Sequence, residues 1–178
     1  MNNQVNQQIL DLLNGLVEHI ATAEMNEFVV SDSNKNIIGT VGLAVCDGIL
    51  FYDRKNKWGM AGHAAGNNKM SLLKDMMKEL PSDKEVVIEY AIVNGYDNIK
   101  NGNCTDTNMM MDYLLNNCPK NIKLVPLQTD LGVRVGKCYD NNFYFDVVSG
   151  KGIGLLSEYY DYLDFSNNDK LSNKGVSK

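Results

Sequence analysis

The stretch GTVGLAVCDGILFYDRKNKWGMAGHAAG, residues 39–66, decides how this chain is expected to fold. Runs rich in β-branched and aromatic residues alternate with glycine and with the polar run RKNK, a pattern typical of antiparallel strands joined by a hairpin. A strand that returns after such a hairpin brings His63 back towards Cys46, seventeen residues earlier. The predicted strands are 36–45, 48–53 and the segment from Trp58, with the hairpin tip at 54–57.

The rest of the chain supplies helices and further strands around this hairpin. Apolar residues spaced three and four apart predict amphipathic helices, and short β-branched runs predict strands. The predicted helices are 5–20, 69–80, 105–117 and 153–165, and the further strands are 27–31, 85–93, 122–128, 132–139 and 142–148. This order predicts an α/β domain of the layered α+β type, in which a mixed, largely antiparallel sheet packs against helices.

The length of 178 residues fits one domain with a substantial core. We predict a single domain over residues 1–165 and a polar, disordered tail over 166–178. The methionine-rich face of helix 69–80 is expected to join the core, and Thr105 or Asp106 to cap the helix that follows.

Charge and cysteine usage narrow the class of function. The net charge of −5, with no Lys and Arg cluster large enough to compensate for it, argues against nucleic-acid binding. No apolar run is long enough to cross a membrane, so membrane insertion is not expected. The N-terminus lacks the pattern of a cleavable signal, so a cytoplasmic location is expected, with export by another route as the alternative. The Cys and His residues lack zinc-site spacing, and neither a metal nor a cofactor is expected.

Cys46 and His63 have the residue types of a thiol catalyst. Such a catalyst needs a thiolate, a base or cation beside it, and hydrogen-bond donors for the oxyanion. Cys46 directly follows a predicted strand, so its backbone N–H is placed to meet a bound carbonyl. Asp47 is expected to be a solvated loop carboxylate, because a carboxylate turned towards the sulfur would disfavour the thiolate.

Other conspicuous residues are interpreted as structural. Asp53 is expected to shape the hairpin turn, Trp58 to pack, and His19 to lie at the surface near a helix end. The remaining cysteines are expected to be small buried apolar residues: Cys104, Cys118 and Cys138.

The opening stretch resembles the CheD family, the chemoreceptor glutamine deamidases. In that family a threonine opens the run before the nucleophilic cysteine, and an aspartate, a glycine and the catalytic histidine follow the cysteine at fixed spacings. The matching residues here are Thr40, Val41, Gly42, Leu43, Cys46, Asp53, Gly59 and His63. The resemblance continues weakly over residues 27–150, and it makes the predicted helix 5–20 and the tail additions to a CheD-like catalytic domain.

The resemblance implies a chemistry. Cys46 would be the nucleophile, His63 its base, and Thr40 the residue that orients the imidazole. The backbone N–H groups of Cys46 and Val45 would stabilise the oxyanion. The implied substrate is a protein that carries a reactive glutamine, such as a chemoreceptor, and a chemotaxis-type regulatory partner is also implied.

Departures from the family pattern leave alternatives open. Ala44 and Val45 stand where the family has Gly-Ser, and Ala64-Ala65-Gly66 replaces the apolar-x-Leu-Pro that follows the histidine in the family. Since these positions shape the substrate groove, the chemistry carries over better than the substrate. One alternative is a deamidase or transglutaminase effector that acts on a host protein. The other is a catalytically degenerate module that binds a partner protein.

Overall fold

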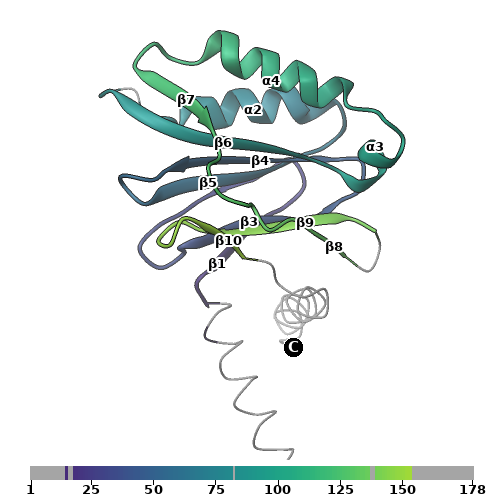
Figure 1. The fold of residues 1–178 in the computed structure, drawn as a ribbon, viewed down its shortest axis with the longest axis horizontal. Coiled ribbons are helices and arrows are strands. Elements are labelled where there is room, and N and C mark those ends of the chain that lie inside the picture. The colour runs from purple at the N-terminus through teal and green to yellow at the C-terminus, as the bar shows by residue number, and fades with distance from the viewer. Residues whose placement is uncertain (1–14, 16–17, 82, 137–138, 154–178) are drawn as a thin grey trace, which may run out of the picture.

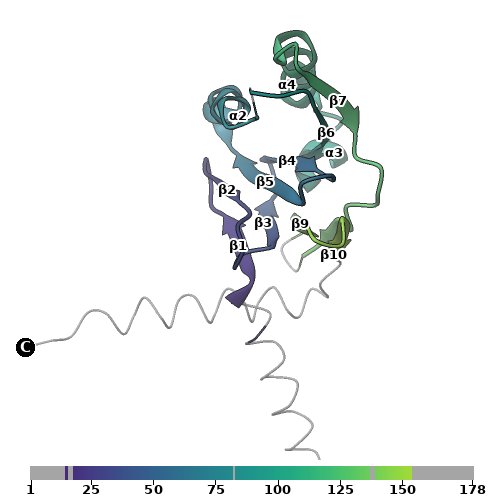
Figure 2. The same cartoon turned by 90° about the vertical axis from the view of Figure 1, so that its left-hand side faces the viewer.

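In a computed structural model, two five-stranded sheets lie face to face, and helices cover the outer face of one of them (Figures 1 and 2). The structure describes residues 15, 18–81, 83–136 and 139–153. Both sheets are mixed and largely antiparallel. The predicted class, a layered α+β sandwich, is therefore confirmed, with two sheets in place of the single one expected.

Sheet A has the order β1-β3-β9-β10, with β8 paired to β9. Only β1 and β3 run parallel. A register shift between Thr40 and Leu43 interrupts the pairing of β3 with β9. The strands are β1 (Ile20–Ala23), β3 (Ile37–Leu43), β8 (Arg134–Val135), β9 (Asn141–Asp146) and β10 (Lys151–Ile153).

Sheet B has the order β2-β5-β4-β6-β7, and only β6 and β7 run parallel. The hairpin β4–β5 is at its centre, as the opening stretch of sequence predicted. The strands are β2 (Phe28–Val30), β4 (Asp47–Asp53), β5 (Trp58–Ala64), β6 (Val86–Asn94) and β7 (Ile122–Pro126).

Helices α2 (Lys69–Lys78) and α4 (Thr105–Asn117) pack on sheet B, on the face away from sheet A (Figure 2). Helix α4 has the predicted bounds, but the expected cap was wrong: the N-cap residue is Cys104, and it makes no side-chain capping bond. None of the helices in the described ranges is long and apolar enough to cross a membrane. The helical segments are η1 (Gly66–Asn68), α2 (Lys69–Lys78), α3 (Tyr96–Lys100) and α4 (Thr105–Asn117).

Two apolar layers hold the fold together. The layer between α2, α4 and sheet B contains Leu73 and Met76, which confirms that the methionine-rich face is core. The layer between the sheets contains Leu50, Tyr52 and Phe143. Strand alternation feeds both layers, because successive residues of β4 point to opposite faces of sheet B.

Several boundaries differ from those predicted. Most of the predicted helix 5–20 lies outside the described residues, and its last residue, Ile20, begins β1 instead. The predicted strand 132–139 is reduced to the two residues of β8. The predicted helix 153–165 and tail 166–178 lie outside the described residues except for Ile153, which ends β10.

Candidate active site

Thr40 and His63 meet between the two sheets. Thr40 is on the inner face of β3 in sheet A, and His63 is on the inner face of β5 in sheet B. The Thr40 Oγ1 and the His63 Nδ1 are 2.8 Å apart, and both residues are buried. The two sheets thus bring together two of the three predicted catalytic residues.

The hydrogen bonds of Thr40 favour one tautomer of His63. The Thr40 hydroxyl donates to the carbonyl of Ala23, 3.0 Å away. Because a hydroxyl has a single proton to donate, its oxygen accepts from the Nδ1–H of His63. The neutral imidazole therefore has its proton on Nδ1 and a free lone pair on Nε2.

The Nε2 atom of His63 is buried and has no hydrogen-bond partner among the described residues. A buried polar atom without a hydrogen-bond partner is uncommon, and a catalytic role is one explanation for it. Burial also lowers the pKa of His63, because an apolar environment disfavours the imidazolium. The histidine is consequently neutral near pH 7 and has the form that a general base requires.

Cys46 directly precedes β4 on the face that His63 occupies. The register places Gly48 opposite His63, and alternation places Cys46 and Gly48 on the same face. Gly48 has to be glycine here, because a Cβ would lie 2.5 Å from the Phe143 ring. The structure has no hydrogen bond between Cys46 and His63, so the two lie on one face of the hairpin without a preformed thiol-imidazole contact.

The environment of Cys46 disfavours a standing thiolate. The residue is 5% exposed. Burial raises the pKa of the Cys46 thiol, the charge of Lys69 lowers it, and the carboxylates of Asp47 and Asp140 raise it. The resulting pKa lies above the ordinary range, so the resting pair is a thiol and a neutral imidazole.

The loop before Cys46 is fixed by the start of α3. The N–H of Asp97 donates to the Ala44 carbonyl at 2.9 Å, and the Asn98 amide donates to the Val45 carbonyl at 3.0 Å. Gly95 permits this approach, because a Cβ there would lie 2.3 Å from the Ala44 oxygen.

This anchoring leaves two N–H groups free. In a trans peptide the N–H points opposite to the carbonyl, so the N–H groups of Val45 and Cys46 point away from α3. Neither of them donates a hydrogen bond to another described residue. They are the two donors expected at an oxyanion site, and the side chain of Val45 is 59% exposed.

The environment of Asp47 differs from the one predicted. It was expected to be a solvated loop carboxylate, but it is the first residue of β4 and is completely buried. Its carboxylate forms an ion pair with Lys69 at 2.9 Å and accepts a hydrogen bond from the Thr107 hydroxyl at 3.0 Å. Lys69 also reaches Asp106 at 3.2 Å. Because alternation turns Asp47 to the helix side, its charge is directed away from the Cys46 face.

Three of the residues interpreted as structural behave as expected: Asp53, Trp58 and His19. Asp53 accepts hydrogen bonds from the backbone N–H and the amide of Asn56, which shapes the β4–β5 turn. Trp58 packs against the core between sheet B and the helices, and His19 is exposed. Cys104 and Cys118 were expected to be buried but are only half-buried, and Cys138 lies outside the described residues.

Comparison with known proteins adds no family. The chain matches no protein-family model, and it matches no curated protein. In the ranges that the structure describes, no group of three or more His, Cys, Asp and Glu side chains is placed to hold a metal ion. The candidate site therefore consists of Thr40, Cys46 and His63, with the backbone N–H groups of Val45 and Cys46.

Proposed function

We propose that this protein is a cysteine-dependent protein glutamine deamidase, a divergent relative of the CheD family. The observation that carries the proposal is the hydrogen bond from His63 to Thr40, which leaves the buried Nε2 of His63 free on the face of the hairpin that Cys46 shares. A packed hairpin needs neither a free imidazole lone pair nor a cysteine beside it. The arrangement supports thiol chemistry.

In the proposed reaction, the Cys46 sulfur attacks the side-chain carboxamide carbon of a glutamine. Nε2 of His63 takes the thiol proton during the attack, and the new C–S bond gives a tetrahedral oxyanion. His63 then returns the proton to the departing nitrogen, the C–N bond breaks, and ammonia leaves. Water, activated by the same nitrogen, hydrolyses the thioester and leaves glutamate and the free thiol.

The raised pKa of Cys46 and the lowered pKa of His63 support general-base catalysis over a standing ion pair. The proton moves only as the sulfur attacks. Thr40 holds the tautomer that this transfer requires, as the third member of a catalytic triad does. The N–H groups of Val45 and Cys46 would contribute about 3–4 kcal/mol each to oxyanion stabilisation.

The proposed substrate is a glutamine in a partner protein, a chemoreceptor by the family resemblance, and the proposed location is the cytoplasm. No nucleic acid or cofactor takes part. One observation favours the second candidate, a degenerate binding module: Cys46 and His63 make no hydrogen bond, and both are nearly buried. A binding module would release no ammonia.

The test is ammonia release from a library of glutamine-containing peptides and from a chemoreceptor cytoplasmic domain. Mass spectrometry of the product should show conversion of glutamine to glutamate. Cys46→Ala should abolish the release and retain the fold, whereas Cys118→Ala, a matched change at a half-buried cysteine, should retain activity. Undiminished ammonia release by the Cys46→Ala variant would falsify the proposal.

A further inference from the structure

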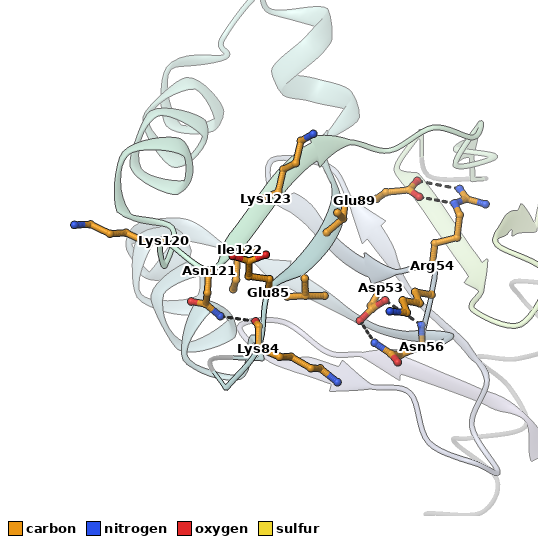
Figure 3. A pocket seen from close by; sticks show the side chains of 13 residues that line it. Asp53, Arg54, Asn56, Lys84, Glu85, Glu89, Lys120, Asn121, Ile122 and Lys123 are labelled. Atoms are coloured by element: carbon orange, nitrogen blue, oxygen red, sulfur yellow. Dashed lines mark hydrogen bonds and ion pairs between the residues drawn. The ribbon is translucent and has the colours of Figure 1, made fainter.

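A groove of about 1030 Å³ lies at the hairpin end of β4, opposite to the end that begins beside Cys46 (Figure 3). The β4–β5 turn and the starts of β6 and β7 line it. The seven residues of β4 span roughly 20 Å, so this groove is separate from the candidate active site.

The floor of the groove is the part of sheet B that sheet A leaves uncovered. Glu89 pairs with Tyr52, whose side chain packs between the sheets, so Val87 and Glu89 are on the inner face of β6. Val87 is nevertheless 51% exposed. Lys123 pairs with Val87 from β7, which is the last strand of sheet B in the described ranges. The exposed apolar part of this floor is Val87, with Glu89 beside it on β6 and Lys123 on the edge strand β7.

The side chains that line the groove have a net positive charge, although the protein as a whole is acidic. Five basic and three acidic side chains line it, in a chain whose net charge is −5. Two of the acids are already satisfied: Asp53 accepts two hydrogen bonds from Asn56, and Glu89 forms two bonds with Arg54 at 2.5 and 2.9 Å. That leaves Glu85 as the one lining carboxylate without an ion pair or hydrogen bond to a described residue.

The lysines, by contrast, are free. None of the four forms an ion pair with a described residue. In Figure 3 the ammonium groups of the three that are labelled point outward from the strands, at the periphery of the groove. The four are Lys55, Lys84, Lys120 and Lys123.

We propose that this groove binds an extended acidic segment of a partner protein. Carboxylates of such a segment would meet the free lysines, and its apolar side chains would cover Val87. A strand-like segment suits the position, because β7 presents an edge to which a further strand can add. A nucleic acid is disfavoured, because the chain as a whole has a pI of about 5.0 and would repel a polyanion.

The probe is a short fluorescein-labelled peptide of alternating glutamate and valine, with fluorescence anisotropy as the readout. We expect saturable binding that weakens as salt is raised. The double variant Lys84→Glu/Lys123→Glu should weaken binding by about tenfold or more, because two attractions become repulsions. The control is Lys100→Glu, which reverses an exposed lysine at the far end of β6 in α3 and should leave the affinity within about twofold.

Circular dichroism melts establish that each variant is folded. Cys46→Ala should bind the probe as the wild type does, which separates this inference from the proposed catalysis. The proposal is overturned if the acidic peptide does not bind, or if a lysine-valine peptide binds equally well. It is also overturned if the double variant binds normally, or if a single-stranded oligonucleotide binds more tightly than the peptide.

Discussion

Thr40 and His63 come from different sheets, and one hydrogen bond of 2.8 Å joins them across the interior of the sandwich. The threonine hydroxyl is placed to donate to the carbonyl of Ala23 in the neighbouring strand β1, and with the proton there its oxygen accepts from the imidazole. The geometry of the sandwich therefore selects the tautomer of the histidine that faces the Cys46 side of the hairpin. This relationship leads to the first prediction.

Thr40→Val should reduce kcat/KM for deamidation by about tenfold or more, with little change in KM. Valine keeps the β-branched shape but leaves the buried Nδ1–H of His63 without an acceptor, a loss of about 1–3 kcal/mol before any effect of a wrong tautomer. Thr40→Ser retains the hydroxyl and should retain most of the activity. Nitrogen NMR of the imidazole should show the Nδ1–H tautomer in wild type and in Thr40→Ser. A Thr40→Val variant with normal kinetics and an unchanged tautomer would contradict this role.

The pKa that defines the acid limb of the pH–rate profile should lie below the ordinary histidine pKa of about 6.5. Burial lowers the pKa of His63, so the neutral, active form persists into mildly acidic solution. The chain has two histidines, and His19→Gln leaves His63 as the only one for an NMR titration. A titration midpoint at or above the ordinary value would show that the imidazolium is not disfavoured.

The same pKa shift predicts how stability depends on pH. The unfolded chain protonates His63 at the ordinary value, whereas the folded chain does so only at lower pH. The contribution of the neutral His63 to the free energy of unfolding is thus complete above about pH 6.5. It is lost as pH falls from there through the pKa of His63 in the folded chain. In His63→Gln this part of the pH dependence should disappear from chemical denaturation curves measured between those limits.

Iodoacetamide should alkylate Cys46 slowly at mildly acidic pH, and the rate should rise with pH into the alkaline range. Burial raises the pKa of this thiol, so little thiolate is present at neutral pH. Peptide-resolved mass spectrometry separates Cys46 from Cys104 and Cys118. Rapid labelling of Cys46 at acidic pH would instead indicate a preformed thiolate-imidazolium pair and would change the order of proton transfer in the mechanism.

The local pattern of apolar residues in the sequence predicted most of this fold. The elements that it did not predict share a cause. The hairpin β4–β5 and helix α4 follow from periodicity within a few residues, which the sequence displays directly. Strand β1 does not: residue 20 was assigned to the predicted helix 5–20 and residues 21–23 to no element, and the segment becomes a strand by pairing with β3. Helix α3 is five residues long and follows Gly95, so it has no periodic signal of its own.

The candidate site was likewise predictable only in part from local sequence. The Cys46-His63 hairpin was readable from spacing, and the role of Thr40 came only from the family resemblance, since β3 and β5 meet through the packing of two sheets. Asp47 was misread because its burial depends on Lys69 of α2, a partner that no local pattern reveals. An extension of the β4 alternation by one residue would have turned Asp47 towards the helices.

Lys69→Met should destabilise the fold by about 3–5 kcal/mol, because it leaves the carboxylate of Asp47 buried without its cation. Lys69→Met/Asp47→Asn, which removes both charges, should recover a large part of that loss. The control Lys78→Met breaks the exposed pair with Asp75 and should change the unfolding midpoint little. Urea denaturation measures all three.

The same Lys69→Met variant should also slow the alkylation of Cys46 at neutral pH. Lys69 lowers the pKa of that thiol, so its removal raises the pKa further and reduces the thiolate fraction. Alkylation is compared without denaturant, at a temperature at which circular dichroism shows that the variant is folded. Faster alkylation would mean that the loss of the ion pair opens the loop at residues 44–46, and that Lys69 acts on Cys46 by positioning that loop and not by its charge.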